Sequence, residues 1–455
     1  MDLLPLFKPK SMAVFGVSPV NERHPANIIY NKNRLQYPAQ VFPVNPRGGS
    51  FQGETLFSDI SEIPGEIDLA VIAIRADLVP EMITRCIEAK VKGAVVISGG
   101  FAEAGRRDLQ DRITDIAMEA HFPFIGPNCL GIYCPSCVDT FFLANERIVK
   151  PGPGNITFIS QSGGILVDQM IKFSQERVGL AKAVSIGNKA VIRETDLLRF
   201  FMEDPETEVI AFYLEGFGEN EGREFVLAAK DCPKPVIVLK SGKSPEAGGA
   251  ISSHTASLAG DYTTFSSVLS QFGIVEARSH LHMVYYCESL SRYQKPAGKN
   301  VAIVTGSGGH GVLAVDVCSN LGLSVPGLSE KAQEELKSKL SPGVKEIASL
   351  KNPVDLTGSV IDDDVVETVR YLSKSPEYDS VVILLLPYSP GISMDLGARL
   401  SQVYMQEGKP LLAYVPHVEK YGMLIEGFEL NGVPVSDTIE GAVFMADALR
   451  RHGTC

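Results

Sequence analysis

One histidine of this sequence has neighbours that favour a role as a reactive side chain over a role in core packing. His254 lies within residues 241–261, a stretch rich in Gly, Ala and Ser whose only large apolar residues are Ile251 and Leu258. Loops this long are uncommon inside compact domains and are usually functional or disordered. A neutral imidazole is a nucleophile near pH 7, and a mobile arm would let it enter two different pockets. The alternative interpretation is an ordinary surface histidine on a mobile loop.

A second candidate is a carboxylate at the end of an apolar run. Glu215 follows residues 209–214, Val-Ile-Ala-Phe-Tyr-Leu, which are typical of a buried strand. A carboxylate in this place can hold one ring nitrogen of a histidine and leave the other nitrogen free to attack. A solvated glutamate at a strand end is the alternative, and the sequence alone does not pair Glu215 with His254.

A turn of small polar residues supplies a candidate anion site. Residues 160–164, Ser-Gln-Ser-Gly-Gly, follow the apolar run 156–159 and precede an amphipathic helical pattern. Exposed N–H groups and the helix dipole stabilise a dianion at a helix N-terminus. Ser162, Gly163 and Gly164 are therefore predicted to bind phosphate.

Two further glycine turns are weaker signals. Gly16-Val-Ser18 follows a strand pattern, but Ser18 and Asn21 stand where the dinucleotide fingerprint G-x-G-x-x-G has its second and third glycines. A plain turn between a strand and a helix is an equally good interpretation. Residues 306–311 match the fingerprint, yet no acidic residue follows at the spacing that reads a ribose. We interpret them as a structural turn, and a nicotinamide-dependent oxidoreductase is disfavoured.

The elements that must position these residues follow one pattern. Three segments, which begin at Lys10, Gly154 and Lys299, each contain a short β-branched run followed by a Gly/Ser turn and a helical pattern. Strands that alternate with helices form parallel sheets with helices on both faces, and ligands bind beyond the carboxyl ends of the strands. Further strands are predicted at 41–45, 69–74, 94–98, 123–126, 181–187, 209–216, 236–242, 381–387 and 410–416.

Two connectors rich in proline and glycine mark the predicted domain boundaries, at residues 150–155 and 294–299. They divide the 455 residues into three α/β domains, 1–149, 150–295 and 296–455. A chain of this size buries a large core, so neither a metal nor a disulfide is needed to hold the fold.

Charge and hydropathy argue against two classes of partner. The formal net charge is -12, whereas nucleic-acid binding needs a basic face. No run approaches the roughly 20 apolar residues of a membrane span, and the N-terminal segment is too interrupted for a signal peptide. The eight scattered cysteines predict reduced thiols in the cytoplasm. Cys129, Cys134 and Cys137 have part of an iron–sulfur spacing without a nearby fourth ligand, and the histidines lack zinc spacings, so no metal site is predicted.

In this order, the motifs resemble those of the alpha subunits of ADP-forming acetate–CoA ligases. These belong to the nucleoside-diphosphate-forming acyl-CoA synthetase superfamily, together with succinyl-CoA synthetase. The resemblance covers essentially the whole chain, and its most specific part is the His254 loop combined with Gly-Pro-Asn-Cys-Leu-Gly at 126–131. The other matching motifs are residues 16–18, 44–46, 100–103, 160–164, 185–189, 213–216, 252–260 and 352–356.

The resemblance implies a CoA-binding Rossmann-like domain followed by two flavodoxin-like domains of the succinyl-CoA synthetase type. It implies that His254 carries a phosphoryl group, supported by Glu215, while acyl-CoA, phosphate and ADP are converted reversibly to carboxylate, CoA and ATP. Acetyl-CoA is the expected substrate. It also implies an ATP-grasp beta subunit in an α2β2 heterotetramer, which would hold most of the ADP or ATP and the Mg²⁺. The expected CoA contacts are Gly16, Ser18, Asn45, Arg75 and Asn128.

Three positions depart from the family pattern. Arg75 replaces a common proline and could itself bind a phosphate. A usual glycine is missing at or near Ala26, and Val191 stands where an aspartate is common. The alternative function is a CoA- or acyl-CoA-sensing regulatory module without ligase activity. Such a module needs no phosphorylatable histidine, so His254 favours the ligase.

Overall fold

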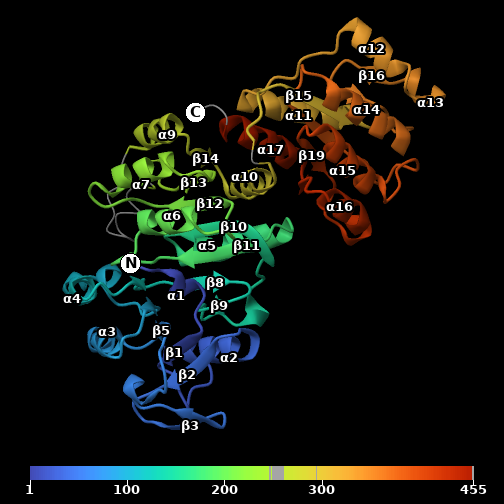
Figure 1. The fold of residues 1–455 in the computed structure, drawn as a ribbon. Coiled ribbons are helices and arrows are strands. Elements are labelled where there is room, and N and C mark those ends of the chain that lie inside the picture. Colours follow the sequence, from blue (N-terminus) through green and yellow to red (C-terminus); the bar gives the residue numbers. More distant parts are fainter. Residues whose placement is uncertain (245–246, 248–260, 294, 453–455) are drawn as a thin grey trace. The chain divides into compact units, whose positions relative to one another are not determined.

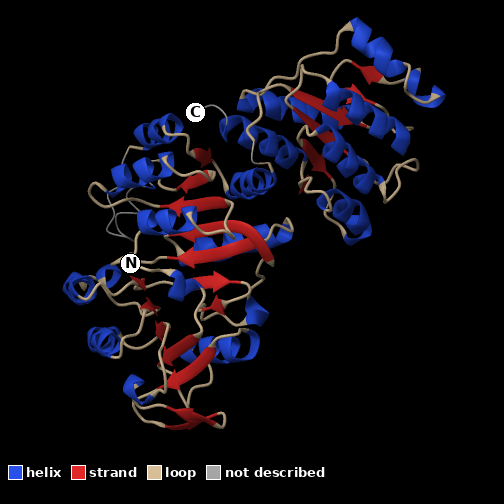
Figure 2. Cartoon of the chain, in the orientation of Figure 1, coloured by secondary structure: helices blue, strands red, loops and turns tan. Residues whose placement is uncertain are grey.

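The computed structural model describes residues 1–244, 247, 261–293 and 295–452 (Figure 1). The chain forms two compact units, Met1–Glu276 and Ala277–Cys455. Figure 2 shows that strands and helices alternate in both units, which confirms the predicted α/β class. The first predicted domain and residues 150–276 of the second fall within the first unit, and the division into three domains stays a prediction. Among the described helices, none is long and apolar enough to cross a membrane.

The first sheet of unit 1 is entirely parallel, with the strand order β2-β1-β5-β6-β7. Strands β5 and β6 are buried at every residue, as apolar strands covered on both faces should be. A small hairpin of β3 and β4 follows β2. The bounds are β1 Ser11–Phe15, β2 Gln40–Val44, β3 Gly49–Phe51, β4 Glu54–Leu56, β5 Leu69–Ile72, β6 Gly93–Val96 and β7 Phe124–Ile125, with helices α1 Leu4–Phe7, α2 Pro25–Gln36, α3 Val79–Glu88 and α4 Arg107–Glu119.

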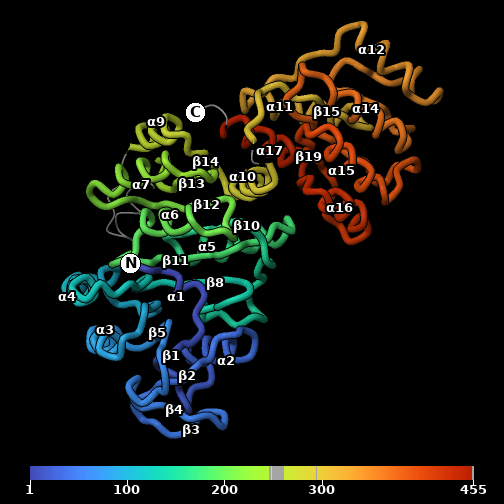
Figure 3. The backbone as a smooth tube through the Cα atoms, in the orientation of Figure 1, coloured from blue at the N-terminus to red at the C-terminus, as the bar shows by residue number. Residues whose placement is uncertain are grey.

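The second sheet of unit 1 has the order β14-β13-β12-β10-β11-β8-β9. Its central strands are parallel, whereas β8 pairs antiparallel with β11. Figure 3 shows the chain passing from the first sheet into the second through β8. The bounds are β8 Gly131–Cys134, β9 Val138–Asp139, β10 Pro153–Ser160, β11 Leu180–Ser185, β12 Val209–Leu214, β13 Val236–Lys240 and β14 Val275–Ala277, with helices α5 Gly163–Gln175, α6 Glu194–Met202, α7 Glu221–Lys230 and α9 Tyr262–Gln271.

Unit 2 holds one sheet of order β16-β17-β15-β18-β19-β20. Its strands are β15 Val301–Thr305, β16 Ser349–Leu350, β17 Val354–Asp355, β18 Ser380–Leu384, β19 Leu411–Tyr414 and β20 Val435–Ser436. Its helices are α10 His280–Arg292, α11 Gly308–Leu321, α12 Glu330–Lys337, α13 Pro342–Lys345, α14 Asp362–Lys374, α15 Leu396–Glu407, α16 Gly422–Glu429 and α17 Ile439–His452.

The turn between β15 and α11 contains the Gly-rich residues 306–311. Ser307 is the N-cap of α11, and its backbone N–H donates to the Thr305 hydroxyl at 3.1 Å. The carboxylate of Asp355 lies beside this turn, 3.1 Å from the place that a Cβ on Gly308 would take.

Two turns fasten the sheets of unit 1 together, one after β7 and the other after β11. The backbone N–H groups of Asn188 and Ala190 donate to the carbonyls of Pro127 and Gly126 at 2.9 and 3.0 Å. Gly187 has a φ of +57°, and a Cβ there would lie 2.3 Å from the Pro127 oxygen. Only glycine allows both this backbone conformation and this close approach. Buried residues of both sheets then form one continuous hydrophobic cluster.

We expect Gly187→Ala to destabilise unit 1 by more than the roughly 1–2 kcal/mol that a Cβ costs in the left-handed region, because the new methyl group also meets backbone oxygens. Gly105→Ala is the matched control, since Gly105 has a φ of +78° but no atom within 4 Å of its virtual Cβ. Urea unfolding of both variants measures the difference. If Gly187→Ala and Gly105→Ala lose the same free energy of unfolding, the close approach of the turns after β7 and β11 does not require a glycine at position 187.

Candidate active site

A cavity of about 1130 Å³ lies between the two sheets of unit 1. Its wall is formed by residues that follow β5, β6 and β7 on one side and β10, β11 and β12 on the other. Ligands of parallel sheets bind at the carboxyl ends of strands, and here two such edges face each other. The space exceeds what a typical drug-sized ligand fills, so it suits an extended cofactor.

The structure brings six of the predicted site residues to this cavity. They come from both sheets, so the folded chain joins the predicted CoA and phosphate positions in one space. His254 lies outside the described residues. The six residues in the wall are Arg75, Asn128, Ser162, Gly163, Gly164 and Glu215.

Three predicted CoA contacts, Gly16, Ser18 and Asn45, are not among the described residues that line the cavity. A Cβ on Gly16 would lie 2.4 Å from the carbonyl oxygen of Ala73, which lines the cavity. The Asn45 side chain donates to a carbonyl of the same turn at 2.8 Å. Ser18 is paired with Asn27 through its own backbone N–H and carbonyl, at 2.7 and 2.8 Å. These residues shape the turn, and their contact with CoA stays a prediction.

Polar residues after strands of the first sheet form one wall of the cavity, and hydrogen bonds connect this polar wall to Asn188, which follows β11. Asn128, whose φ is +59°, donates its backbone N–H to the Ser98 carbonyl at 2.8 Å and its side-chain amide to Asn188 at 3.3 Å. Asn188 in turn donates to the Glu103 carboxylate. Burial alone would raise the pKa of Glu103, but hydrogen bonds from Asn188 and from the Gly100 backbone outweigh burial and lower that pKa.

The exposed cation of this wall is Arg75. Its side chain is 82% exposed and lies 3.4 Å from Asp77, which Arg106 also contacts. Arg75 can therefore reach a ligand phosphate without breaking a buried contact. His24 also lines the cavity, and sequence reasoning missed it. Its Nδ1 accepts the Ala26 N–H at 3.2 Å as the N-cap of α2, and burial lowers its pKa.

The N-terminus of α5 points its free amides at the cavity. Ser162 is the N-cap, and its hydroxyl accepts the Ile165 N–H at 3.4 Å. The N–H groups of Gly163 and Gly164 belong to the first turn, which has no intrahelical acceptors. Both glycines line the cavity. Amides and a helix dipole in this arrangement suit an anion, and residues 162–164 are called the anion cradle below. Phosphate binding there stays a prediction.

Gln161 fixes the strand end that carries Glu215. Its side-chain oxygen accepts the backbone N–H groups of Glu215 and Gly216 at 2.5 and 3.1 Å. Its side-chain nitrogen donates to the Gly216 carbonyl at 2.7 Å and to Glu194. Glu194 also pairs with Lys189 at 2.9 Å. Sequence reasoning placed Gln161 in a motif but missed this role, which depends on a neighbouring strand.

The described elements that flank the His254 segment in the sequence lie beside Glu215. Strand β13 precedes the segment, and the ammonium of Lys240 at its end donates to the Glu215 carbonyl at 2.8 Å. Helix α9 follows the segment, and its Phe265 ring lies 5.7 Å from the same ammonium. Both flanking elements therefore meet at the end of β12.

The three cysteines with partial iron–sulfur spacing are free thiols. The buried Cys129 sulfur lies 3.3 Å from the carbonyl of Val96, and burial raises the pKa of Cys134 to about 11. Within the part of the chain that the structure describes, no group of three His, Cys, Asp or Glu residues could hold a metal ion.

Comparison with known families agrees with this architecture. Residues 10–135 match the model of the CoA binding domain, and residues 153–290 match that of the succinyl-CoA ligase like flavodoxin domain. The chain thus belongs to the class of proteins that join a CoA binding domain to a succinyl-CoA ligase like flavodoxin domain.

Comparison with individual proteins narrows this class. The alpha subunit of acetate–CoA ligase [ADP-forming] II from Pyrococcus furiosus is 34% identical, over 97% of this chain and 96% of its own length. The alpha subunit of ligase I from the same organism is 33% identical, over 99% and 97%. A solved structure of a dinucleotide forming acetyl-coenzyme A synthetase 1 from Ca. Korarchaeum cryptofilum, in complex with phosphate and ADP, matches with a TM-score of 0.87 and 29% identity, over 99% and 97%.

The chain belongs to the family of alpha subunits of ADP-forming acetate–CoA ligases. The predicted family, ligase activity and CoA cofactor are thereby confirmed, and the CoA-sensing alternative finds no support. The name of the family implies a partner subunit. Several relatives are longer than the part that this chain matches; in acetate–CoA ligase [ADP-forming] I from Archaeoglobus fulgidus the match covers 54% of the length, at 36% identity.

Replacing Gln161 tests whether it stabilises the end of β12 through its hydrogen bonds and not only by packing. Gln161→Leu removes the acceptor of two backbone N–H groups, and we expect it to lower the free energy of unfolding by about 2 kcal/mol or more. Gln175→Leu is the control, because Gln175 is exposed at the end of α5 and should cost less than about 0.5 kcal/mol. Thermal unfolding compares the two, and similar melting temperatures would contradict the assignment.

Proposed function

We propose that this chain is the CoA-binding, phosphohistidine-carrying subunit of an ADP-forming acyl-CoA synthetase, with acetyl-CoA as the first substrate to test. One observation carries the proposal. Glu215 and the anion cradle at residues 162–164 share one cavity, and strand β13, which precedes the His254 segment in the sequence, ends in a contact with Glu215. A carrier histidine needs an anion site, a supporting carboxylate and an attachment close to both.

The first chemical step would take place in the anion cradle. Phosphate, held by the first N–H groups of α5, attacks the thioester carbonyl, so a C–O bond forms, the C–S bond breaks and CoA leaves as the thiolate. The product is an acyl phosphate. Preorganised N–H groups stabilise the charge that develops on the phosphate and carbonyl oxygens.

His254 would accept the phosphoryl group in the second step. A neutral imidazole nitrogen attacks phosphorus, the P–O bond to the acyl group breaks and the carboxylate leaves. Glu215 holds the other ring nitrogen and stabilises the positive charge that develops on the ring. Asp261, the N-cap of α9, is seven positions after His254. A chain of this length spans at most about 25 Å, which limits the reach from this anchor.

CoA would lie along the polar wall of the first sheet. Arg75 is the proposed phosphate contact because its guanidinium is exposed in the cavity wall. A planar guanidinium binds phosphate oxygens in pairs, which supports this choice. Asn128 lies in the same wall, and the turn with Gly16, Ser18 and Asn45 is proposed to complete the nucleotide site.

The partner would supply the nucleotide. The relative from Archaeoglobus fulgidus is nearly twice as long as its matched part. We infer that the missing portion corresponds to an ATP-grasp beta subunit, which holds ADP and Mg²⁺ and receives the phosphoryl group in an α2β2 complex. The free cysteines among the described residues suit the reducing cytoplasm that we propose as its location.

His254→Ala tests the carrier. The variant should fold and bind CoA but lose ATP synthesis in the complex, because no neighbouring side chain replaces a covalent carrier. Incubation with labelled phosphate and acetyl-CoA should leave no acid-labile, base-stable label on it. His121→Asn is the control, since His121 is exposed after α4 and outside the described cavity wall. Label on His254→Ala would place the carrier elsewhere.

The purified chain alone should make no ATP from acetyl-CoA, ADP and phosphate. Addition of an ATP-grasp subunit should restore synthesis, since ADP binding belongs to the partner in this proposal. A coupled luciferase assay measures both states. ATP synthesis by the isolated chain at the rate of the complex would refute the division of labour between two subunits.

A further inference from the structure

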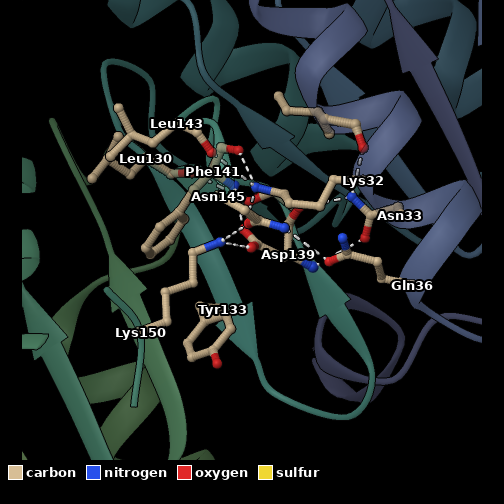
Figure 4. Close-up of polar contacts among 12 residues, drawn as sticks. Lys32, Asn33, Gln36, Leu130, Tyr133, Asp139, Phe141, Leu143, Asn145 and Lys150 are labelled. Carbon is tan, nitrogen blue, oxygen red and sulfur yellow. Dashed lines mark hydrogen bonds and ion pairs between the residues drawn. The ribbon is translucent and has the colours of Figure 1, made fainter. Parts of the chain in front are cut away.

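A buried cluster of two lysines and one aspartate lies where α2 meets the chain after β9 (Figure 4). Asp139 is completely buried, and the side chains of Lys32 and Lys150 are 4% and 11% exposed. The Lys32 ammonium lies 2.9 Å from the Asp139 carboxylate, and Lys150 contacts the other carboxylate oxygen. Asn33, next along α2, pairs with the backbone of Asp139 in both directions, at 2.7 and 3.0 Å.

Lys32 also holds the chain that follows Asp139. Its ammonium donates to the carbonyl oxygens of Phe141 and Leu143, at 2.5 and 3.5 Å. These two carbonyls bracket Phe142, so one buried cation fixes the backbone on both sides of that ring. Burial lowers the pKa of Lys32 to about 8, against the opposing pull of Asp139, which shows how far the ammonium is withdrawn from water.

The residues held in this way form part of the cavity wall. Phe142 and Leu143 both line the cavity, although they follow β9 at the edge of the second sheet. Leu130 lines it as well and lies close to the anion cradle, 3.2 Å from the place that a Cβ on Gly163 would take. The cavity therefore has an apolar wall of Leu130, Phe142 and Leu143 in addition to its polar wall.

We propose that Lys32 is a positioning residue that sets how far Phe142 and Leu143 project into the cavity, and thereby limits the size of the apolar acyl group that the enzyme accepts. The proposal rests on the proposed ligase function, because the acyl group is attacked in the anion cradle. An apolar wall favours acyl groups without a second carboxylate, since a buried unpaired charge is costly there. Lys32 itself touches no substrate.

Phe142→Ala tests the wall directly. The ring is only partly buried, so its removal should leave the chain folded. In the complex with the ATP-grasp subunit, the ratio of kcat/KM for isovaleryl-CoA to that for acetyl-CoA should rise about tenfold, because methylene-sized differences in an apolar pocket have effects of this order. CoA affinity, measured by calorimetry on the chain alone, should change little.

Lys32→Met tests the positioning role. Loss of the two carbonyl contacts should raise the same ratio by a smaller factor, through KM more than kcat. Lys150→Met should leave the ratio unchanged, because Lys150 donates to Asp139 and Asn145 and not to the carbonyls beside Phe142. Lys182→Met is a second control: Lys182 is 1% exposed and pairs with Asp204 at 2.6 Å, but it lies outside the described cavity wall.

The outcomes are distinct. An inactive wild-type complex would refute the proposed function, whereas an active complex whose ratio is unchanged in Phe142→Ala would overturn the acyl-size limit. If Lys32→Met and Lys182→Met change the kcat/KM ratio equally, Lys32 contributes only general stability and does not position Phe142. If Lys32→Met does not fold, Lys32→Arg is tested instead. Arginine keeps the positive charge but moves the N–H donors away from the carbonyls of Phe141 and Leu143. An unchanged ratio in that variant would also overturn the proposal.

Discussion

The hydrogen bonds between the turns after β7 and β11 are the constraint on which the rest of unit 1 depends. They bring the carboxyl ends of two separate sheets face to face, and the cavity exists because of that arrangement. Gly187 makes the contact possible, since any Cβ there would strike the opposing backbone. The predicted CoA contacts Arg75 and Asn128 and the anion cradle come from different sheets, so neither sheet alone could form the site.

Most of the fold could be predicted from the sequence because its strands are short, apolar and followed by small residues. Every strand predicted from such a run is present, including β5 and β12 at the two walls of the cavity. Periodicity marks an element and its end, but it does not say which strand becomes its neighbour. The antiparallel entry of β8 into the second sheet was accordingly not predicted.

Site residues could be predicted only where the types of neighbouring residues in the sequence indicate a function. Small residues after a strand predicted residues 162–164, which do line the cavity, whereas Asn45 followed from resemblance and holds a turn outside the described lining. Gln161 and Lys32 escaped prediction because their partners are 54 and 109 residues away in the sequence. When a side-chain amide or ammonium bonds to backbone groups that are distant in the sequence, the residues around it in the sequence show no pattern. Such a contact can be found only in the folded chain.

The turns that begin α5 and α11 share one design, in which a hydroxyl at the end of a strand accepts the N–H of the serine that caps the helix. Asp355 distinguishes them, because its carboxylate stands beside the first turn of α11. A helix that already has a fixed negative neighbour repels a second anion, while α5 presents its unneutralised end to the cavity. The described chain thus contains two helix starts of one construction, and the carboxylate beside the second makes it the less favourable place for an anion.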